Sequence, residues 1–320
     1  MKIVVLDGYV VNPGDLDWIA LEALAGDDGL TVHDRTPKEL VVERIGDAEA
    51  IFTNKTLLTR ETLAAAPRLK YVGVLATGYN VIDLAAAGDL GLVVTNVPGY
   101  ATDAVAQHVF ALLLEIASRV GLHDACVHDG EWAACKDFAF FRAPLFELAG
   151  KTLGIVGYGT IGQAVARIAK AFGMRVLASR TKPFAPDGLV EPSTFEEILA
   201  RADIVSLHCP LTEATRGLMD RATFERMKPG AILINTARGP VVVEADLAEA
   251  LRSGRLSAAA VDVLSREPAD PANPLLSAPN CLITPHIAWM PRETRARLLT
   301  VAADNLAAFQ TGRPVNVVRG

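Results

Sequence analysis

The stretch that decides the fold is Lys151–Arg180, KTLGIVGYGTIGQAVARIAKAFGMRVLASR. Thr152–Val156 is a short apolar run of the kind that forms a strand covered on both faces. Apolar residues then repeat at helical spacing over Ile161–Phe172, and Met174–Ala178 resumes the strand pattern. This order of strand, turn, helix and strand predicts one parallel βαβ unit.

The turn inside this unit carries three glycines at G-x-G-x-x-G spacing, which is typical of a dinucleotide site. The first glycine permits the turn, the second lets the backbone approach a pyrophosphate, and the third lets the helix pack closely on the strand. The helix N-terminus attracts the phosphates. We therefore predict cofactor contacts from Gly157, Gly159, Thr160, Ile161 and Gly162. The alternative is that the glycines serve only a tight turn.

The end of the second strand bears on which dinucleotide binds. An acidic side chain there would hydrogen-bond the ribose hydroxyls of NAD. The sequence instead has Ser179, Arg180, Thr181 and Lys182. Because an arginine fork suits a phosphate, these residues favour NADP(H). NAD is the alternative, in which Arg180 and Lys182 are solvated loop charges.

Composition limits the class of protein. A chain of 320 residues with 51% hydrophobic and 21% charged residues is typical of a globular protein with two domains. A net charge of -6 without a basic run argues against nucleic acid or membrane as a partner. The N-terminal MKIVVLDGYV is expected to be a strand rather than a secretory signal, so we expect a cytoplasmic protein. The four cysteines lack C-x-x-C spacing, and we expect no metal site.

Strands and helices alternate in two separate parts of the chain. We predict an α/β protein with two Rossmann-like doubly wound domains, in which a dinucleotide-binding domain (residues 101–287) is inserted into a smaller flavodoxin-like substrate domain (residues 1–100 and 288–320). A helix is expected over Asp103–Val120, with a looser pattern beyond it. A last helix is expected near Pro291–Thr311, and Val315–Val318 could pair back with the first domain.

Three polar elements follow strands in the second half: Asn235–Gly239, Asp262–Pro268 and Thr284–Trp289. Strand topology places them on the cofactor side of one sheet. A cation, Arg238, a carboxylate, Glu267, and an imidazole, His286, suit hydride transfer to or from a 2-oxo or 2-hydroxy acid. Arg238 would hold the substrate, His286 would pass the proton, and Glu267 would orient the ring and favour its charged form. Taken singly, each could instead be a surface ion pair, a solvated charge or a strand cap.

The motifs VGYGTIG, NTARGPVVVEADLAEAL, DVLSREP and NPLLSAPNCLITPHIAW resemble the D-isomer-specific 2-hydroxyacid dehydrogenase family over nearly the whole chain. The pattern is most similar to members called glycerate dehydrogenase or hydroxypyruvate reductase. The resemblance implies an NAD(P)-dependent oxidoreductase acting on the CH–OH group, with hydroxypyruvate or glyoxylate as substrate, working as a homodimer. Two rivals remain: a dinucleotide-sensing, corepressor-like protein with little turnover, and a sibling formate or phosphite dehydrogenase.

The same resemblance implies roles for individual residues. Arg238, Glu267 and His286 form the catalytic trio. The residues flanking the cofactor are His208, Pro210, Thr236, Ala237 and Asp262, the last binding the nicotinamide carboxamide. The substrate carboxylate is held by backbone amides of Thr77, Gly78 and Tyr79. Lys55 could reach the substrate or be a solvated turn residue. Trp289, where many members have a small residue, could narrow the pocket or pack between domains.

Overall fold

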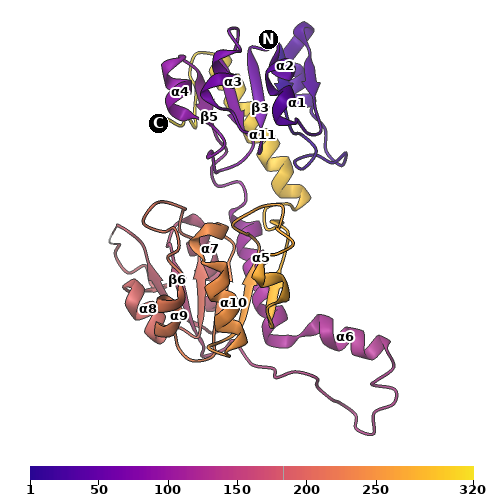
Figure 1. Cartoon of the computed structure of the whole chain (residues 1–320), viewed down its shortest axis with the longest axis vertical. Coiled ribbons are helices and arrows are strands. Elements are labelled where there is room, and N and C mark those ends of the chain that lie inside the picture. The colour runs from indigo at the N-terminus through magenta and orange to yellow at the C-terminus, as the bar shows by residue number, and fades with distance from the viewer. Residues whose placement is uncertain (183) are drawn as a thin grey trace. The chain divides into compact units, whose positions relative to one another are not determined.

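The computed structural model describes residues 1–182 and 184–320, and the chain forms two compact units (Figure 1). Unit 1 consists of Met1–Ala101 and Trp289–Gly320. Unit 2 consists of Thr102–Ala288 and is therefore inserted into unit 1. Both units are α/β folds built on parallel sheets.

The sheet of unit 1 has five parallel strands in the order β2-β1-β3-β4-β5. The strands are β1 (Ile3–Val5), β2 (Leu30–Val32), β3 (Ala50–Thr53), β4 (Tyr71–Val74) and β5 (Val93–Thr95). This is the flavodoxin-like order, in which the direction of winding reverses between β1 and β3. The central strands β1, β3 and β4 are buried along their whole length, which explains their continuous apolar sequence.

The helices of unit 1 are α1 (Ile19–Ala25), α2 (Val41–Ile45), α3 (Arg60–Ala64), α4 (Leu84–Asp89) and α11 (Arg292–Gln310). Although α11 comes from the far end of the chain, it packs against α1 and β4. Its Arg295 is only 6% exposed and forks onto Asp15, with Nη1–Oδ1 and Nη2–Oδ2 distances of 2.8 and 2.6 Å. A bidentate pair with a buried arginine of this kind helps to fix α11 in unit 1.

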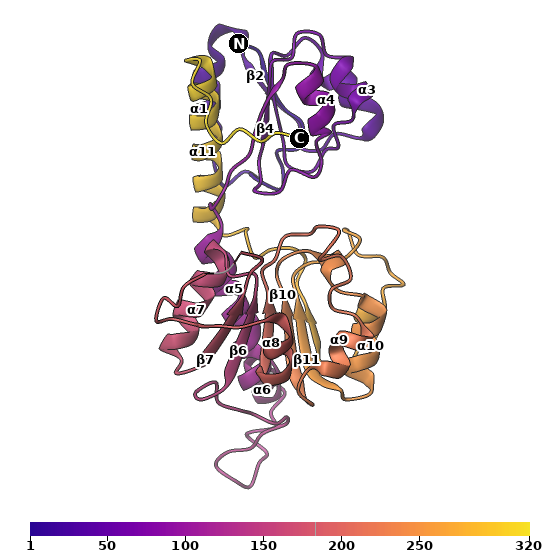
Figure 2. The ribbon, with the colours of Figure 1, turned by 90° about the vertical axis from the view of Figure 1, so that its left-hand side faces the viewer.

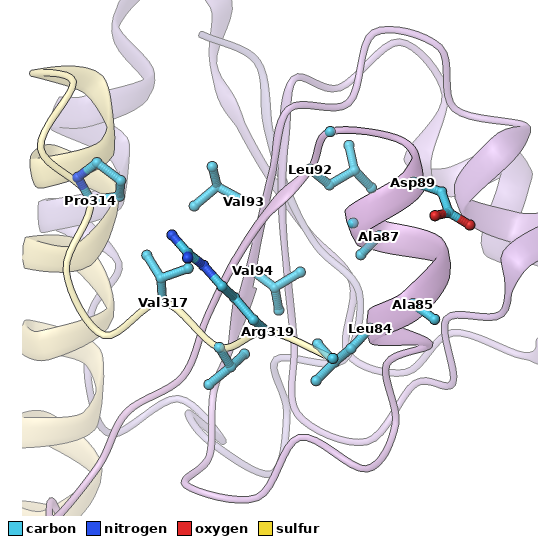
Figure 3. A pocket seen from close by; sticks show the side chains of 14 residues that line it. Leu84, Ala85, Ala87, Asp89, Leu92, Val93, Val94, Pro314, Val317 and Arg319 are labelled. Carbon is cyan, nitrogen blue, oxygen red and sulfur yellow. The ribbon is translucent and has the colours of Figure 1, made fainter.

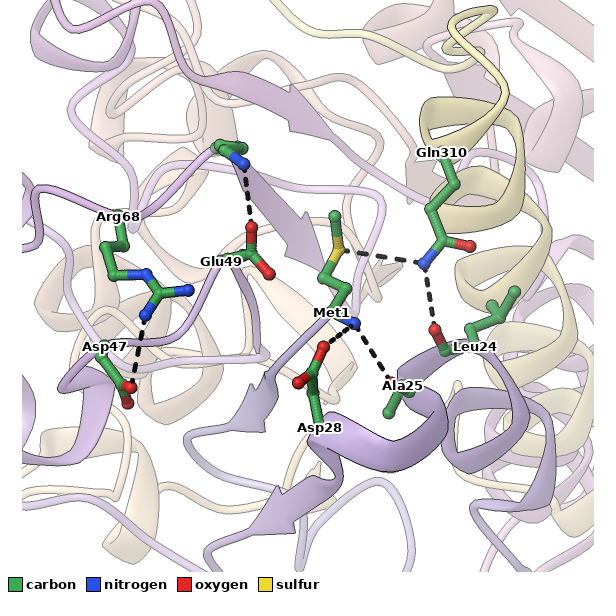
Figure 4. A network of polar contacts seen from close by, with 9 residues as sticks. Met1, Leu24, Ala25, Asp28, Asp47, Glu49, Arg68 and Gln310 are labelled. Atoms are coloured by element: carbon green, nitrogen blue, oxygen red, sulfur yellow. Dashed lines mark hydrogen bonds and ion pairs between the residues drawn. The ribbon is translucent and has the colours of Figure 1, made fainter.

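The chain termini are tied into the same unit. Figure 4 shows the Met1 ammonium bonded to Asp28 at 2.7 Å and to the Ala25 carbonyl at 3.1 Å. Gln310 donates to the Leu24 carbonyl at 3.0 Å and so joins the end of α11 to α1. At the other terminus Val317 bridges Thr95 in antiparallel fashion. The predicted return of residues 315–318 to the first domain is thus confirmed.

Unit 1 also contains a cavity of about 560 Å³ between α4, β5 and the C-terminal segment (Figure 3). Its lining is mainly aliphatic, with side chains such as Leu84, Val94 and Val317. The one acidic side chain in it, Asp89, is held by Arg60 at 2.8 Å. Such a lining suits apolar packing better than acid–base chemistry.

The sheet of unit 2 has seven parallel strands in the order β12-β11-β10-β9-β6-β7-β8. They are β6 (Thr152–Val156), β7 (Arg175–Ser179), β8 (Glu191–Pro192), β9 (Ile204–Leu207), β10 (Ala231–Asn235), β11 (Leu256–Val261) and β12 (Cys281–Ile283). The strand order reverses between β6 and β9, which is the Rossmann switch point where dinucleotides bind.

Helices cover both faces of this sheet (Figure 2). Helices α5 (Thr102–Ser118) and α7 (Thr160–Ala171) share one core, whereas α8 (Phe195–Arg201), α9 (Arg221–Arg226) and α10 (Glu244–Arg252) share the other. Successive strand residues alternate between the two cores: Ile232 and Ile234 belong to the first and Leu233 to the second. Two apolar faces explain why the strands read as continuous hydrophobic runs.

Helix α5 ends earlier than predicted. Arg119 adopts a left-handed backbone with φ of 49°, and the chain bends by 56° before continuing as α6 (Val120–His128). The expectation of one helix to Val120 followed by a loose pattern is therefore wrong. Helix α6 and the chain after it extend away from the sheet of unit 2 (Figure 1). Within the described part of the chain, no single helix has the length and apolar character to span a membrane. The bent pair α5–α6 has the length and composition of a span when its two helices are taken together, and that is the whole of the evidence for one.

Candidate functional site

The glycine turn between β6 and α7 shows which glycines the fold itself requires. Gly157 has φ of 102°, and a Cβ there would lie 2.5 Å from the Cys209 nitrogen. A Cβ at Gly162 would lie 2.6 Å from the Gly157 oxygen. Gly159 differs, because a Cβ there would meet nothing within 4 Å. The packing of the chain gives no reason for this glycine, whereas close approach of a pyrophosphate does.

A cavity of about 910 Å³ lies against this turn. The predicted cofactor residues that line it are Gly157, Gly159, Ser179, Arg180, Thr181, His208 and Pro210. Lys182 lines it as well and adds a second cation beside Arg180. Thr160, Ile161 and Gly162 form the first turn of α7. The residues present therefore fit a dinucleotide, with its pyrophosphate on the turn and its ribose near the end of β7.

Two predicted cofactor residues follow β10. The Thr236 hydroxyl is buried and has no hydrogen-bond partner among the described residues. A buried hydroxyl in this state calls for a partner, which a bound group can supply. Asn235 fixes the two residues that follow Thr236. Its Oδ1 accepts from the Ala237 nitrogen and its Nδ2 donates to the Arg238 carbonyl, both at 3.0 Å.

His208 directly follows β9, the strand beside β6, and β6 leads into the glycine turn. Its ring Nε2 lies 2.9 Å from the Ser206 hydroxyl, and its backbone nitrogen donates to the Val156 carbonyl at 2.7 Å. Burial lowers the pKa of His208 to about 4, because the charged imidazolium would lose its hydration. The side chain is therefore a neutral wall of the cavity at pH 7.

The structure brings Glu267 and His286 together. Nδ1 of His286 lies 2.7 Å from Oε2 of Glu267. The other carboxylate oxygen of Glu267 accepts from the Leu264 nitrogen at 3.1 Å, so this carboxylate is itself fixed. One ring nitrogen of His286 is thus committed to Glu267, which leaves Nε2 for a reacting group.

His286 has an uncommon backbone conformation, with φ of 57° for a non-glycine residue. Asp262 holds the turn that follows: its Oδ1 accepts from the Ile287 nitrogen and its Oδ2 from the Ala288 nitrogen, both at 2.9 Å. Oδ1 also accepts from the Thr284 hydroxyl at 2.6 Å. Asp262 therefore clamps the turn on both sides of His286. Oδ2 accepts a single hydrogen bond among the described residues, from Ala288, so it is the oxygen that could accept the predicted carboxamide contact.

His108 on α5 also contacts Asp262 and Thr284. Its Nε2 lies 3.0 Å from the Thr284 hydroxyl and 3.5 Å from Oδ1 of Asp262. Burial alone would raise the pKa of Asp262, but the hydrogen bonds from His108, Thr284 and the backbone outweigh it and lower that pKa. His108 was not among the site residues predicted from the sequence.

Arg238 follows β10, the strand beside β11, and is half-buried. Its Nη1 donates to the Ala237 carbonyl at 2.8 Å. The next residue, Gly239, touches the backbone before Glu267 so closely that a Cβ would lie 2.0 Å from the Leu264 carbonyl carbon. The segments that carry Arg238 and Glu267 are therefore in direct contact.

The predicted substrate residues belong to unit 1. Lys55 and Thr77 follow β3 and β4, neighbouring strands, and so lie at one edge of the sheet. The Thr77 hydroxyl donates to the Val97 carbonyl at 2.8 Å. Gly78 is half-buried, and Tyr79 is 39% exposed. The roles of these four residues stay predictions.

Trp289 is also in unit 1, where it is 9% exposed. Its ring meets that of Tyr100 edge-on, with centroids 6.4 Å apart. Because Tyr100 belongs to the same unit, this contact decides between neither of the two roles expected of Trp289, and both stay predictions. Across residues 1–182 and 184–320, no three His, Cys, Asp or Glu side chains gather as a metal site would need.

The chain is similar to known proteins over nearly its full length. The family model for the D-isomer specific 2-hydroxyacid dehydrogenase NAD binding domain matches residues 110–288. A hydroxypyruvate reductase of Blautia hydrogenotrophica is 49% identical over 99% of both chains. A glycerate dehydrogenase of Methylorubrum extorquens is 41% identical over 88% of this chain and 89% of its own. The structure of an NADPH-dependent glyoxylate/hydroxypyruvate reductase of Sinorhizobium meliloti, in complex with NADP and malonate, aligns with a TM-score of 0.84 at 30% identity and covers 99% of this chain and 96% of that one.

Proposed function

The chain belongs to the D-isomer-specific 2-hydroxyacid dehydrogenase family, and on this premise we propose that it reduces hydroxypyruvate or glyoxylate with a nicotinamide cofactor. We place it in the cytoplasm as a homodimer. The observation that carries the proposal is the pair formed by His286 and Glu267, in the same unit as a turn whose Gly159 leaves space for a pyrophosphate. The 49% identity to a hydroxypyruvate reductase supports the choice of substrate.

The chemistry follows from the orientation of the pair. The chemistry that a reduced nicotinamide would supply when bound is a hydride for the carbonyl carbon of the 2-oxo acid. His286 donates a proton from Nε2 to the carbonyl oxygen, while Glu267 holds Nδ1 and stabilises the positive ring before transfer. Arg238 binds the substrate carboxylate and polarises the carbonyl, since its guanidinium always stays charged. The product is a 2-hydroxy acid, and His286 is left neutral.

The preferred cofactor is NADP(H) in this proposal. Arg180 and Lys182 line the cavity at the end of β7, where an acidic residue would select NAD. Glu197 is the one acidic residue among those that line this cavity, and it caps α8, where it accepts from the Thr194 nitrogen at 2.7 Å. Two cations, beside a carboxylate that is already hydrogen-bonded to the backbone, suit a ribose 2′-phosphate.

The homodimer is proposed from α6 and the segment that follows it. Apolar side chains are exposed along both: Val120 (61%), Leu122 (42%), Trp132 (52%), Phe138 (93%) and Phe141 (71%). Such a surface indicates a protein contact, and a second copy of the chain is the partner we propose. Sedimentation of the F138S/F141S variant should give a monomer where the wild type gives a dimer. A monomeric wild type would contradict the proposal.

Steady-state kinetics over several 2-oxo acids, with NADH and NADPH, test the reaction. H286A should lower kcat about 1,000-fold while cofactor affinity stays within twofold. H33A is the matched control, because the half-buried His33 of unit 1 belongs neither to the proposed site nor to the proposed dimer surface. Turnover of H286A at the wild-type rate would refute the assignment. Cofactor binding by the wild type without any turnover would favour the sensor alternative, and oxidation of formate alone would favour the sibling dehydrogenase.

A further inference from the structure

Tyr158, between the first two glycines of the cofactor turn, has no part in the reaction as described above. Its side chain is 1% exposed, and its hydroxyl donates to Oδ2 of Asp187 at 2.5 Å. This distance is typical of a hydroxyl bonded to an ionised carboxylate. Asp187 lies on the segment between β7 and β8, so the bond joins the phosphate turn to the residues that follow Arg180.

The same segment carries Phe184, which lies between Tyr158 and Arg180. The rings of Tyr158 and Phe184 have centroids 4.9 Å apart, and the Arg180 guanidinium carbon lies 5.1 Å from the centroid of the Phe184 ring. Nε of Arg180 donates to the Lys182 carbonyl at 2.8 Å. The position of the Arg180 fork therefore depends on where this segment lies.

Asp187 fastens the segment at its far end as well. Its Oδ1 accepts from the Leu189 nitrogen at 2.9 Å and from the Val190 nitrogen at 3.3 Å. Val190 is buried in the core shared with Tyr158. The hydrogen bond from Tyr158 lowers the pKa of Asp187, which agrees with an ionised acceptor at neutral pH.

We propose that Tyr158, through its hydrogen bond to Asp187 and its ring contact with Phe184, is a positioning residue that sets the preference for the 2′-phosphorylated cofactor. It holds Arg180 at the end of β7, where the ribose 2′-phosphate binds. This inference rests on the proposed NADP(H) preference. Because NADH lacks that phosphate, loss of the Tyr158 hydroxyl affects NADPH and spares NADH.

The test compares Y158F, R180A and the double variant by the KM values for NADPH and NADH. We expect Y158F to raise the KM for NADPH about fivefold, the effect of losing one charge-assisted hydrogen bond, with the KM for NADH and both kcat values within twofold. Because Tyr158 acts through Arg180, Y158F/R180A should be no worse than R180A alone. Y71F is the matched control, since Tyr71 in unit 1 has a buried hydroxyl 2.6 Å from that of Thr95.

Three results overturn the inference. Equal rises in the KM for both cofactors would give Tyr158 a merely structural role. Additive effects in the double variant would show that Tyr158 does not act through Arg180. If R180A leaves the KM for NADPH unchanged, the proposed cofactor preference itself fails and the inference falls with it. Thermal unfolding of each variant separates these outcomes from loss of fold.

Discussion

Glu267 holds His286 through Nδ1, at 2.7 Å, and is held in turn by the Leu264 amide. E267Q keeps the size of the side chain but removes the charge that stabilises the imidazolium. We expect kcat to fall about 100-fold, with the KM for the cofactor nearly unchanged. The pH profile of kcat measures the effect, and E213Q, on an exposed loop, serves as the control. A wild-type profile in E267Q would remove Glu267 from the mechanism.

Asp262 gives a second prediction, because both its oxygens accept from the turn around His286. D262N replaces one acceptor with an amide donor, which then faces a backbone or hydroxyl donor. We expect a loss of about 2 kcal/mol of stability together with a tenfold or greater fall in kcat. D203N is the control: Asp203 accepts from the Thr152 amide at 2.8 Å at the opposite edge of the same sheet. That variant should lose stability and retain kcat. Equal kcat values for the two variants would contradict the positioning role of Asp262.

The glycines of the cofactor turn are expected to separate binding from folding. G159A should fold normally, because its Cβ meets open space, and should raise the KM for the cofactor about tenfold or more. G162A places a Cβ 2.6 Å from the Gly157 oxygen and should cost about 1–3 kcal/mol of stability. Melting temperatures of G159A and G162A measure the change in stability, and cofactor titrations of the same two variants measure the change in affinity. A G159A variant with wild-type cofactor affinity would argue against a pyrophosphate on this turn.

His208 makes the stability of the apoprotein depend on pH. Its folded-state pKa of about 4 lies below the ordinary value of 6.5, so the unfolded chain binds more protons between these values. The stability that the neutral form of His208 contributes to the folded state is complete above pH 6.5 and is lost as the pH falls toward 4. We expect the wild type to lose about 2 kcal/mol more than H208Q between pH 7 and pH 5. Identical pH dependence of the melting temperature in the two proteins would show that His208 does not titrate in this range.

Much of the fold could be predicted from the sequence, because strands with helices packed on both faces of their sheet appear as continuous apolar runs. The predicted bounds of β6, Thr152–Val156, agree with the structure, and this strand is fully buried. Helices α3 and α4 went unpredicted, since five or six residues are too few to show a helical period. Their caps were visible in the sequence: Thr59 and Asp83 accept from the third residue beyond each of them.

From the sequence, only the site residues that follow neighbouring parallel strands could be predicted to lie together. Parallel neighbours β10, β11 and β12 end at one edge, which is why Arg238, Glu267 and His286 could be grouped from sequence. The contact between His108 and Thr284 spans 176 positions and depends on how α5 packs on the sheet, so no local pattern reveals it. Likewise, the bend at Arg119 arises from one left-handed residue in an otherwise helical sequence.

The insertion of unit 2 has a consequence for the order in which the protein matures on the ribosome. Residues 102–288 emerge as one uninterrupted stretch and can complete their own core at once. The first 101 residues must wait, because the helix that covers α1 and β4 is translated last. We therefore expect a nascent chain stalled before Arg292 to carry a protease-resistant second unit and a protease-sensitive N-terminal segment.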